Sequence, residues 1–366
     1  MAPASLRAIA GGKLLPTTVI GSHAFPSWLW SARKDIEAGN YGPLDLTETL
    51  NDAVRIAIED QQDAGIDVIS DGEMRRTDFI LGFYKRFTPL ETILPARRMG
   101  HSGYDEITRY RALDRLAAPN GLGAVAEYQY ASKVARQPVK VALPGPLTLC
   151  TAVDPAPAYA DIGALAHDLA AIINAELKSV VTAGATIIQL DEPGVFRFLP
   201  TVEEKVVLFN EAVAGVDALI CLHVCFGNYR KQNSQFRRYS RVFPGLLGTR
   251  ADCFLLEFAN REMAEIDRWS AWEEEWATTL TAAGLTPPEP RELAVGVIDV
   301  KSFHVETPEE VAWRIHQILR HVSPERLVLT ADCGFSQTAR WVAVAKLRAL
   351  VEGAALVRRE LTGAAG

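Results

Sequence analysis

The chain has 366 residues, of which 48% are hydrophobic and 23% charged, and its formal net charge is −7. This composition is ordinary for a globular protein, and the length suits one large α/β barrel. The negative charge argues against nucleic acid as the main partner, because binding phosphates requires a clearly basic face.

The cysteines and the N-terminal residues bear on localisation. Five cysteines, an odd number without dense spacing, are typical of a reducing compartment. Residues 1–10 lack the apolar core of a signal peptide, and no stretch approaches the roughly 20 apolar residues of a membrane span. We therefore expect a cytoplasmic protein that does not bind a membrane.

Short apolar segments alternate with amphipathic helical patterns along the chain. The first helix is expected to follow a capping box at Asp45–Glu48 and to end at Gly65. Eight such units without a composition break predict one parallel (β/α)₈ TIM barrel over residues 1–366. A doubly wound open sheet is the alternative, although its fingerprint G-x-G-x-x-G is absent. The expected strands cover residues 14–20, 66–69, 139–143, 185–190, 218–222, 253–256, 293–298 and 327–330.

The pattern weakens between residues 86 and 138, which contain several tyrosines and arginines. We expect a long insertion between the second and third strands. Long insertions in compact domains often form lids or binding loops. A surface excursion that packs on its own domain explains the segment equally well.

The segment Cys221–Tyr229 carries the clearest chemical signal. It begins as an apolar run and then presents His223 and Cys225. Residues two apart on a strand point to the same face, so an imidazole and a thiolate would project side by side, as two zinc ligands must. A buried cysteine beside a hydrogen-bonded core histidine is the alternative, and it is common for so short a motif.

Chemically reactive residues follow seven of the eight expected strands. In (β/α)₈ barrels the active site is built at these carboxyl ends, so Cys225 and Cys333 would face each other across the barrel mouth. Together with His223 and Glu257 they make a set of zinc-type ligands. The strand-end residues are Ser22, Glu73, Asp191, His223, Cys225, Glu257, Lys301 and Cys333.

In combination and order, seven short stretches are specific for one family. The chain resembles the catalytic barrel of cobalamin-independent methionine synthase over nearly its whole length, an architecture shared with uroporphyrinogen decarboxylase, which needs no metal. The stretches are Thr17–Ser22, Asp71–Glu73, Ile187–Pro193, His223–Cys225, Leu256–Glu257, Gly296–Asp299 and Asp332–Gly334.

The resemblance implies a zinc-dependent methyltransferase that forms methionine from homocysteine. Zinc would hold the substrate thiol as a thiolate, which attacks an electrophilic methyl group. The family's zinc ligands fall on His223, Cys225, Glu257 and Cys333. Its contacts to homocysteine fall on Ile20 and Ser22 for the carboxylate, and on Glu73 and Asp191 for the amino group.

Three departures from the family concern the methyl donor. The second, N-terminal barrel of the folate-dependent members has no counterpart in these 366 residues. The family's proton-donating histidine corresponds to Lys301, with His304 as the nearest histidine, so both are candidate catalytic residues. A tryptophan expected near Thr151 is missing. The donor is therefore either 5-methyltetrahydrofolate or a methylated corrinoid such as methylcobalamin, which a corrinoid protein could carry.

Two other functions fit parts of the pattern. A zinc enzyme resembling epoxyalkane:coenzyme M transferase would alkylate a different thiol, although Glu73 and Asp191 favour a substrate with an amino group. A non-catalytic zinc-binding subunit would dock a corrinoid protein, for which the basic residues between Arg230 and Arg250 are suitable.

Overall fold

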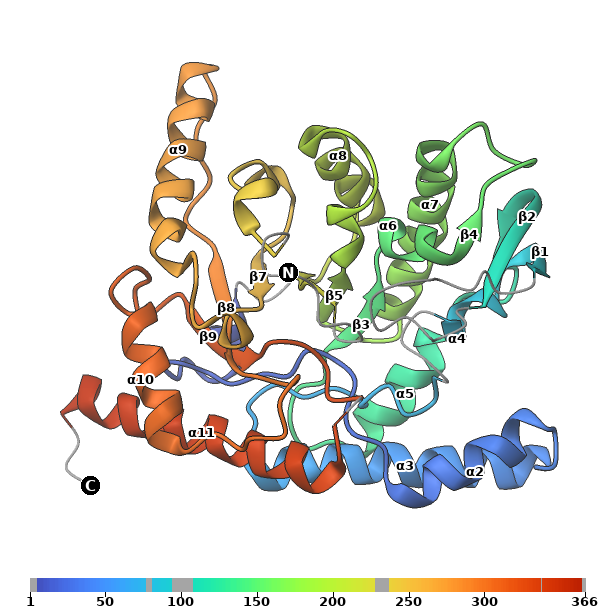
Figure 1. Cartoon of the computed structure of the whole chain (residues 1–366), viewed down its shortest axis with the longest axis horizontal. Helices are drawn as coiled ribbons and strands as arrows, with labels where there is room; N and C mark the ends of the chain where they lie inside the picture. The colour runs from blue at the N-terminus through green and yellow to red at the C-terminus, as the bar shows by residue number, and fades with distance from the viewer. Residues whose placement is uncertain (1–4, 77–80, 94–107, 228–236, 337, 364–366) are drawn as a thin grey trace.

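The structure is a computed structural model that describes residues 5–76, 81–93, 108–227, 237–336 and 338–363. The main strands lie in the middle of the molecule and the helices surround them (Figure 1). Six parallel strands form one sheet in the order β3-β5-β6-β7-β8-β9. Their bounds are β3 (Val141–Pro144), β5 (Ile187–Asp191), β6 (Leu219–Val224), β7 (Cys253–Leu256), β8 (Glu292–Ile298) and β9 (Leu327–Ala331).

Every residue of these six strands is buried, as expected for parallel strands covered on both faces. The α/β class with a parallel sheet is confirmed. The first two expected strands are present only as isolated parallel bridges, which pair Thr17 with Leu329, Thr18 with Val68 and Ile69 with Val139. The six named strands form an open sheet, and these bridges span the gap between its edge strands β9 and β3.

A local cause keeps the first segment from becoming a strand. Leu15 has a φ of 49°, outside the extended region. The backbone N–H of Thr17 donates to the Asp67 carboxylate at 2.8 Å instead of to a neighbouring strand. Side-chain hydrogen bonds of this kind compete with the ladder of a sheet, and the apolar pattern does not reveal them.

The helices cover the outside of the sheet. Helix α3 begins at Pro43 with Gly42 as its N-cap and no side-chain cap, so the capping box predicted at Asp45–Glu48 is wrong. Its end at Gly65, with a φ of 87°, agrees with the prediction. The helices are α1 (Leu6–Ile9), α2 (Ser27–Glu37), α3 (Pro43–Ala64), α4 (Leu81–Tyr84), α5 (Ala124–Val134), α6 (Pro146–Leu149), α7 (Ile162–Thr182), α8 (Val202–Ala212), α9 (Trp269–Ala282), α10 (Pro308–Ile318) and α11 (Arg340–Thr362).

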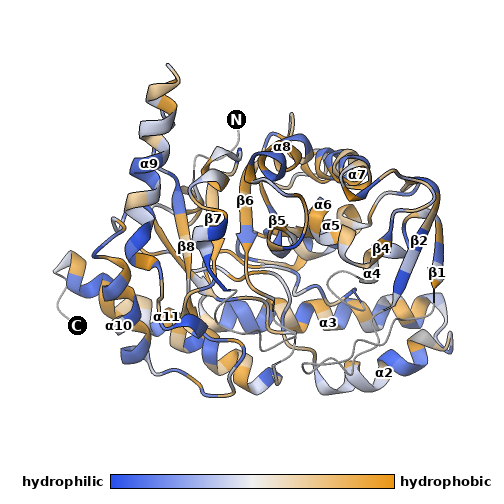
Figure 2. Ribbon diagram, turned by 45° about the horizontal axis from the view of Figure 1, so that its top comes forward, coloured by the Kyte–Doolittle hydropathy of each residue, from blue (hydrophilic) through white to orange (hydrophobic). Residues whose placement is uncertain are grey.

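Polar and apolar residues alternate along α3, whereas β6 is almost continuously apolar (Figure 2). This contrast is the one expected between an amphipathic surface helix and a central strand. Among the described helices, none is long and apolar enough to cross a membrane.

The expected insertion at residues 86–138 contains both sheet and helix. Strands β1 (Thr88–Ile93) and β2 (Arg109–Ala117) pair antiparallel, and β2 also pairs with the short β4 (Val153–Asp154). Helix α5 contacts both α3 and α7, so this part of the segment belongs to the helical layer. Residues 94–107 lie outside the described part of the chain.

Candidate metal and substrate site

Three of the four predicted metal ligands lie together at the carboxyl ends of β6 and β9. His223 belongs to β6, Cys225 follows it directly, and Cys333 follows β9. One donor atom from each residue lies within 4.8 Å of the others, and the two sulfur atoms are 3.7 Å apart. We call these three residues the thiol cluster.

The thiol cluster fits a zinc ion by two observations. Nδ1 of His223 lies 3.1 Å from the Leu255 carbonyl, which can only accept, so Nδ1 carries the proton. Nε2 of His223 is buried and has no hydrogen-bond partner, which leaves its lone pair free for a metal. Two sulfurs on one tetrahedral zinc, each at about 2.3 Å from it, lie about 3.8 Å apart, close to the observed separation.

The fourth predicted ligand, Glu257, is engaged elsewhere. Its Oε1 lies 2.6 Å from Nζ of Lys301 and 3.5 Å from Nη1 of Arg237, and the backbone N–H of Phe226 donates to its Oε2. The side chain of Glu257 is fully buried. Glu257 thus lies next to the strand end that carries Cys225, but it is paired with cations.

Two buried residues hold the loops that carry the ligands. The Tyr239 hydroxyl donates to the Val224 carbonyl at 2.8 Å and accepts from the Glu257 N–H at 2.6 Å. The Asp332 carboxylate accepts from three consecutive backbone N–H groups, beginning at Phe258, at 2.6–2.8 Å. The strand ends at β6, β7 and β9 are therefore joined by hydrogen bonds. No residue pattern near Tyr239 reveals this role, since its partners lie on other elements.

The pKa values of the two thiols of the cluster are shifted in opposite directions. A hydrogen bond from Cys333, with His223 and Lys301 nearby, holds the pKa of Cys225 well below its usual range. The same hydrogen bond and burial raise the pKa of Cys333. Cys225 is therefore ready to act as a thiolate ligand, which is the form that binds metals.

The two predicted contacts to an amino group, Glu73 and Asp191, are both buried. Burial raises the pKa of Glu73 to about 8, although Arg76 at 3.2 Å opposes this shift. Burial also raises the pKa of Asp191 to about 6, against the effect of His223. Burial is the largest cause of both raised pKa values, and an ammonium group bound by the two acids would favour their ionised forms. We call Glu73 and Asp191 the carboxylate pair.

Ile20 and Ser22, the predicted contacts to the substrate carboxylate, lie between the carboxylate pair and the thiol cluster. A Cβ atom on Gly21 would come within 2.5 Å of Oε1 of Glu73, and one on Gly334 within 1.9 Å of Oγ of Ser22. The backbone carbonyl of Ser22 accepts from the Phe335 N–H at 2.8 Å. The turn that follows Ile20 therefore fits tightly between the carboxylate pair and the loop of Cys333, which requires glycine at both close approaches.

His304, a predicted catalytic candidate, and Glu192, the acid next to Asp191, both have partners outside the thiol cluster. The His304 side chain is 60% exposed and lies 3.1 Å from Glu310, with no described contact to the thiol cluster. The Glu192 carboxylate accepts from the N–H groups of Leu147 and Thr148 at the start of α6. Of the two adjacent acids, only Asp191 is thus left for a substrate.

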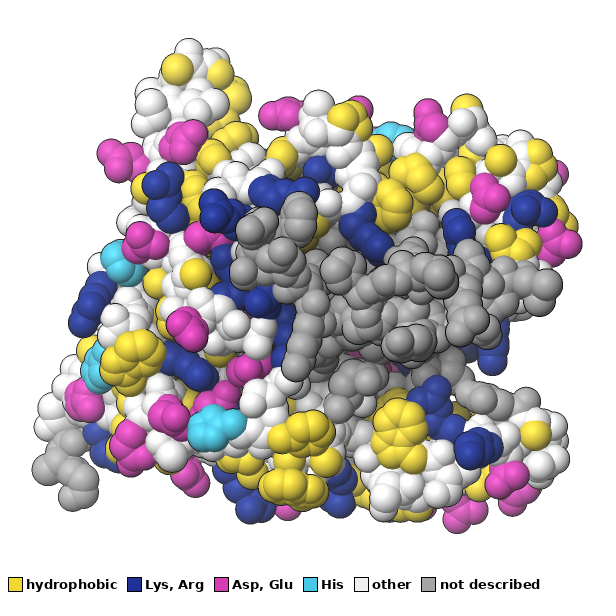
Figure 3. All heavy atoms as spheres, viewed as in Figure 1, with side chains coloured by type: hydrophobic (Ala, Val, Ile, Leu, Met, Phe, Trp, Pro, Cys, Tyr) yellow, Lys and Arg dark blue, Asp and Glu magenta, His cyan; other side chains and the backbone are white. Residues whose placement is uncertain are grey.

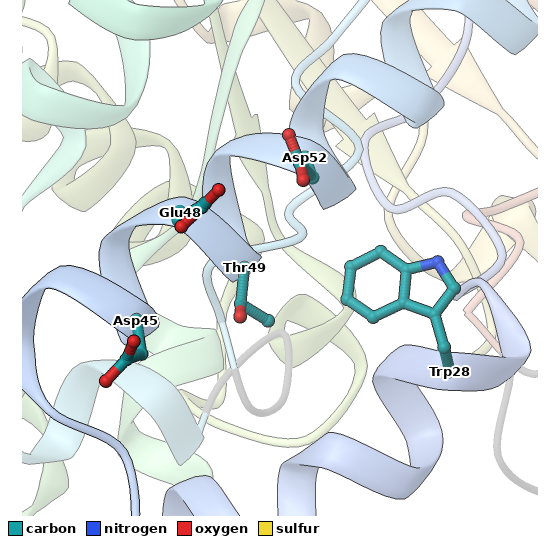
Figure 4. A pocket seen from close by; sticks show the side chains of 5 residues that line it. All are labelled: Trp28, Asp45, Glu48, Thr49 and Asp52. Atoms are coloured by element: carbon teal, nitrogen blue, oxygen red, sulfur yellow. The ribbon is translucent and has the colours of Figure 1, made fainter.

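A separate groove lies on the outer surface between α2 and α3 (Figure 4). Its carboxylates occupy one exposed face of α3, the usual arrangement for the solvent side of an amphipathic helix. Over the face seen in Figure 3, acidic and basic side chains are interspersed. The groove is lined by Trp28, Asp45, Glu48, Thr49 and Asp52.

Comparison with known proteins identifies the class of this chain. The family described as cobalamin-independent synthase, catalytic domain, matches residues 15–356. Methionine synthases of Saccharolobus islandicus and Sulfurisphaera tokodaii are 34% and 32% identical, each over 95% of this chain and 96% and 94% of their own length. A B12-independent methionine synthase of Shewanella sp., solved in complex with selenomethionine, has a TM-score of 0.79 and 28% identity over 96% of this chain and 100% of its own.

The chain belongs to the cobalamin-independent methionine synthase family, through the catalytic domain. The family predicted from the sequence is confirmed, and with it the prediction of an enzyme of the methyltransferase class. The match covers nearly all of the relatives' own length.

Proposed function

We propose that this protein transfers a methyl group to the thiol of homocysteine and forms methionine, with a zinc ion held by His223, Cys225 and Cys333. The observation that carries the proposal is the thiol cluster, with its free Nε2 and a sulfur separation of 3.7 Å. The family match supports the reaction class. Glu257 is the candidate fourth ligand because it adjoins the cluster through the strand end at Phe226.

A zinc ion bound at this site would act as a Lewis acid and keep a substrate thiol ionised near neutral pH. The sulfur of homocysteine then attacks the methyl carbon of the donor. A sulfur–carbon bond forms, and the bond from the methyl carbon to the donor breaks, leaving its electron pair on the donor. The substrate thiol proton passes to solvent before this step. His223 and Cys225 of the thiol cluster are buried, and Cys333 is partly exposed.

The protein's own residues would orient the amino-acid end of homocysteine. The carboxylate pair would bind the ammonium group, whose positive charge favours the ionised form of both buried acids. Ile20 and Ser22 would face the carboxylate of the substrate. The Shewanella relative in complex with selenomethionine supports an amino-acid site of this kind.

The environment of Lys301 favours a methylated corrinoid as the donor. Burial lowers the pKa of Lys301, but its ion pair with Glu257 at 2.6 Å outweighs burial and raises it overall. A lysine whose pKa is raised is a poor general acid near neutral pH. When methyltetrahydrofolate gives up its methyl group, the nitrogen of the departing tetrahydrofolate needs a proton. When a methylated corrinoid does so, the departing cobalt needs none. We therefore infer methylcobalamin, free or on a corrinoid protein, as the donor.

Parallel assays of the zinc-loaded protein test this function. Homocysteine is offered with methylcobalamin or with methyltetrahydrofolate, and coenzyme M replaces homocysteine in a third assay. We expect methionine from methylcobalamin and at least tenfold slower turnover with the folate. Alkylation of coenzyme M alone would overturn the choice of homocysteine, and equal rates with both methyl donors would overturn the inference from Lys301.

A further inference from the structure

Lys140 is a buried lysine whose hydrogen bonds lead to the candidate site. It immediately precedes β3, and its side chain is 1% exposed. Nζ of Lys140 lies 2.5 Å from the Val19 carbonyl and 2.5 Å from Oε1 of Gln189. None of the ion pairs among the described residues includes Lys140. Burying an ammonium group costs several kcal/mol unless hydrogen bonds compensate it, so its position calls for a physical explanation.

Lys140 fixes the orientation of the Gln189 amide. An ammonium group only donates, so the oxygen of the amide must face Lys140 and its NH₂ group must face the other way. That NH₂ group donates to the Ile20 carbonyl at 2.9 Å and to Oδ1 of Asp191 at 2.6 Å. Gln189 is completely buried, so water cannot replace either partner.

The two side chains therefore join both predicted contact regions of the amino-acid end. Lys140 holds the carbonyl of Val19, and Gln189 holds that of Ile20, directly before the turn at Gly21 and Ser22. The same NH₂ group of Gln189 also donates to the carboxylate of Asp191 and restrains it. The network connects three segments that are far apart in the sequence.

We propose that Lys140 and Gln189 are positioning residues that determine specificity for an amino-acid thiol, an inference that rests on the proposed function. Lys140 acts through Gln189, whose amide orients Asp191 toward the ammonium group and holds the 19–22 segment beside the carboxylate. Without Lys140 the buried amide oxygen has lost the donor that holds it, which removes one of the three anchors of the amide. The amide can then shift away from Asp191, so Asp191 loses its orientation.

The test compares two thiols in the zinc-loaded protein with methylcobalamin as donor. Homocysteine carries both recognition groups, and 2-mercaptoethanol carries neither. For Lys140→Met and for Gln189→Met we expect the KM of homocysteine to rise on the order of tenfold or more, with kcat changed less than about threefold and mercaptoethanol kinetics unchanged. Equal losses with both thiols would indicate a merely structural role and overturn the proposal.

A double variant tests whether Lys140 acts through Gln189. If it does, Lys140→Met combined with Gln189→Met raises the KM of homocysteine no further than Gln189→Met alone, because the second change removes a group that has lost its target. If the increase in KM in the double variant equals the product of the increases in the two single variants, this coupling is contradicted. Gln189→Glu offers a variant of matched size that retains a partner for Lys140. It places a second carboxylate beside Asp191, and a KM like that of the unchanged protein would also overturn the proposal.

Lys346 provides a matched control. It is another buried lysine, with 0% exposure, and its Nζ pairs with Glu306 at 2.7 Å between α11 and the start of α10. We expect Lys346→Met to lower the Tm while leaving the ratio of kcat/KM for the two thiols unchanged. A similar fall in this ratio would show that the loss of any buried lysine reduces specificity, contrary to the proposal.

Calorimetric titration with methionine separates this inference from the proposed function. Failure of the unchanged zinc-loaded protein to bind methionine would contradict the function itself. Binding by the unchanged protein with equal affinity in Lys140→Met would contradict only the positioning role. We expect binding in the unchanged protein and at least tenfold weaker binding in the variant.

Discussion

The two halves of the candidate site differ in how their polar groups are satisfied. In the thiol cluster, the backbone beside the strand ends orients the ligands, as the Leu255 carbonyl does for His223. In the carboxylate pair, side chains close in sequence do this work, with Arg76 three residues after Glu73 and Gln189 two residues before Asp191. The thiol cluster is thus prepared for a metal by the backbone of the neighbouring strand, whereas the carboxylate pair is held by side chains, with the cation of Arg76 already beside Glu73.

The largest expected effect breaks the first half. Cys225→Ser and Cys333→Ser each remove one sulfur of a pair 3.7 Å apart, and we expect zinc affinity to fall on the order of a thousandfold and turnover to be lost. Metal analysis after dialysis and competition with a chromogenic chelator measure the loss. Cys150→Ser is the matched control, because this thiol lies outside the cluster. Full zinc content in both cluster variants would refute the ligand assignment.

A change in the carboxylate pair is expected to weaken substrate binding and to leave the zinc content unchanged. Asp191→Asn keeps the size of the side chain but removes the charge that would face the ammonium group. We expect a KM for homocysteine roughly 100-fold higher, because a buried charge loses its partner, with unchanged zinc content. Steady-state kinetics and metal analysis on the same preparation check both. An unchanged KM would remove Asp191 from the substrate site.

The contrast between the halves also explains what the sequence could predict. His223 and Cys225 share one strand, so their proximity follows from the period of a strand, and Cys333 follows from the rule that strand ends meet. Lys140 and Gln189 were not predicted, because nothing in their neighbourhood marks a hydrogen bond to residues 19 and 20. The strand predicted at residues 14–20 is reduced to isolated parallel bridges at Thr17 and Thr18, and the sequence does not show that Asp67 accepts the N–H of Thr17.

The raised pKa of Glu73 predicts a pH dependence of stability. Its pKa is about 8 in the folded protein against 4.5 for the ordinary group, so between these values the folded state binds a proton that the unfolded state does not. The unfolding free energy contributed by this group therefore falls as pH rises from 4.5 to 8. We expect Glu73→Gln, which cannot ionise, to be more stable than the unchanged protein at pH 8 by on the order of a few kcal/mol, and equally stable near pH 4.5.

Denaturant unfolding of the ligand-free protein at several pH values measures this difference. The same variant should bind methionine more weakly, so stability and binding change in opposite directions. Glu176→Gln is a useful control, because this buried carboxylate is paired with the N–H groups of Leu122 and Ala124. A difference between Glu73→Gln and the unchanged protein that does not vary with pH would contradict the assignment.

The smallest effect on turnover is expected for a change at His304. A nearly unchanged kcat would place this residue outside the catalytic site. Its imidazole is 60% exposed and faces Glu310, whose carboxylate also accepts the Thr307 N–H at the start of α10. This ring contacts an exposed carboxylate and has no described contact to the thiol cluster, so His304→Ala should change kcat less than about twofold with either methyl donor. Selective loss of turnover with methyltetrahydrofolate would instead identify His304 as the proton donor. The ring would then have to leave Glu310 during turnover, because a general acid must reach within hydrogen-bonding distance of the group that it protonates.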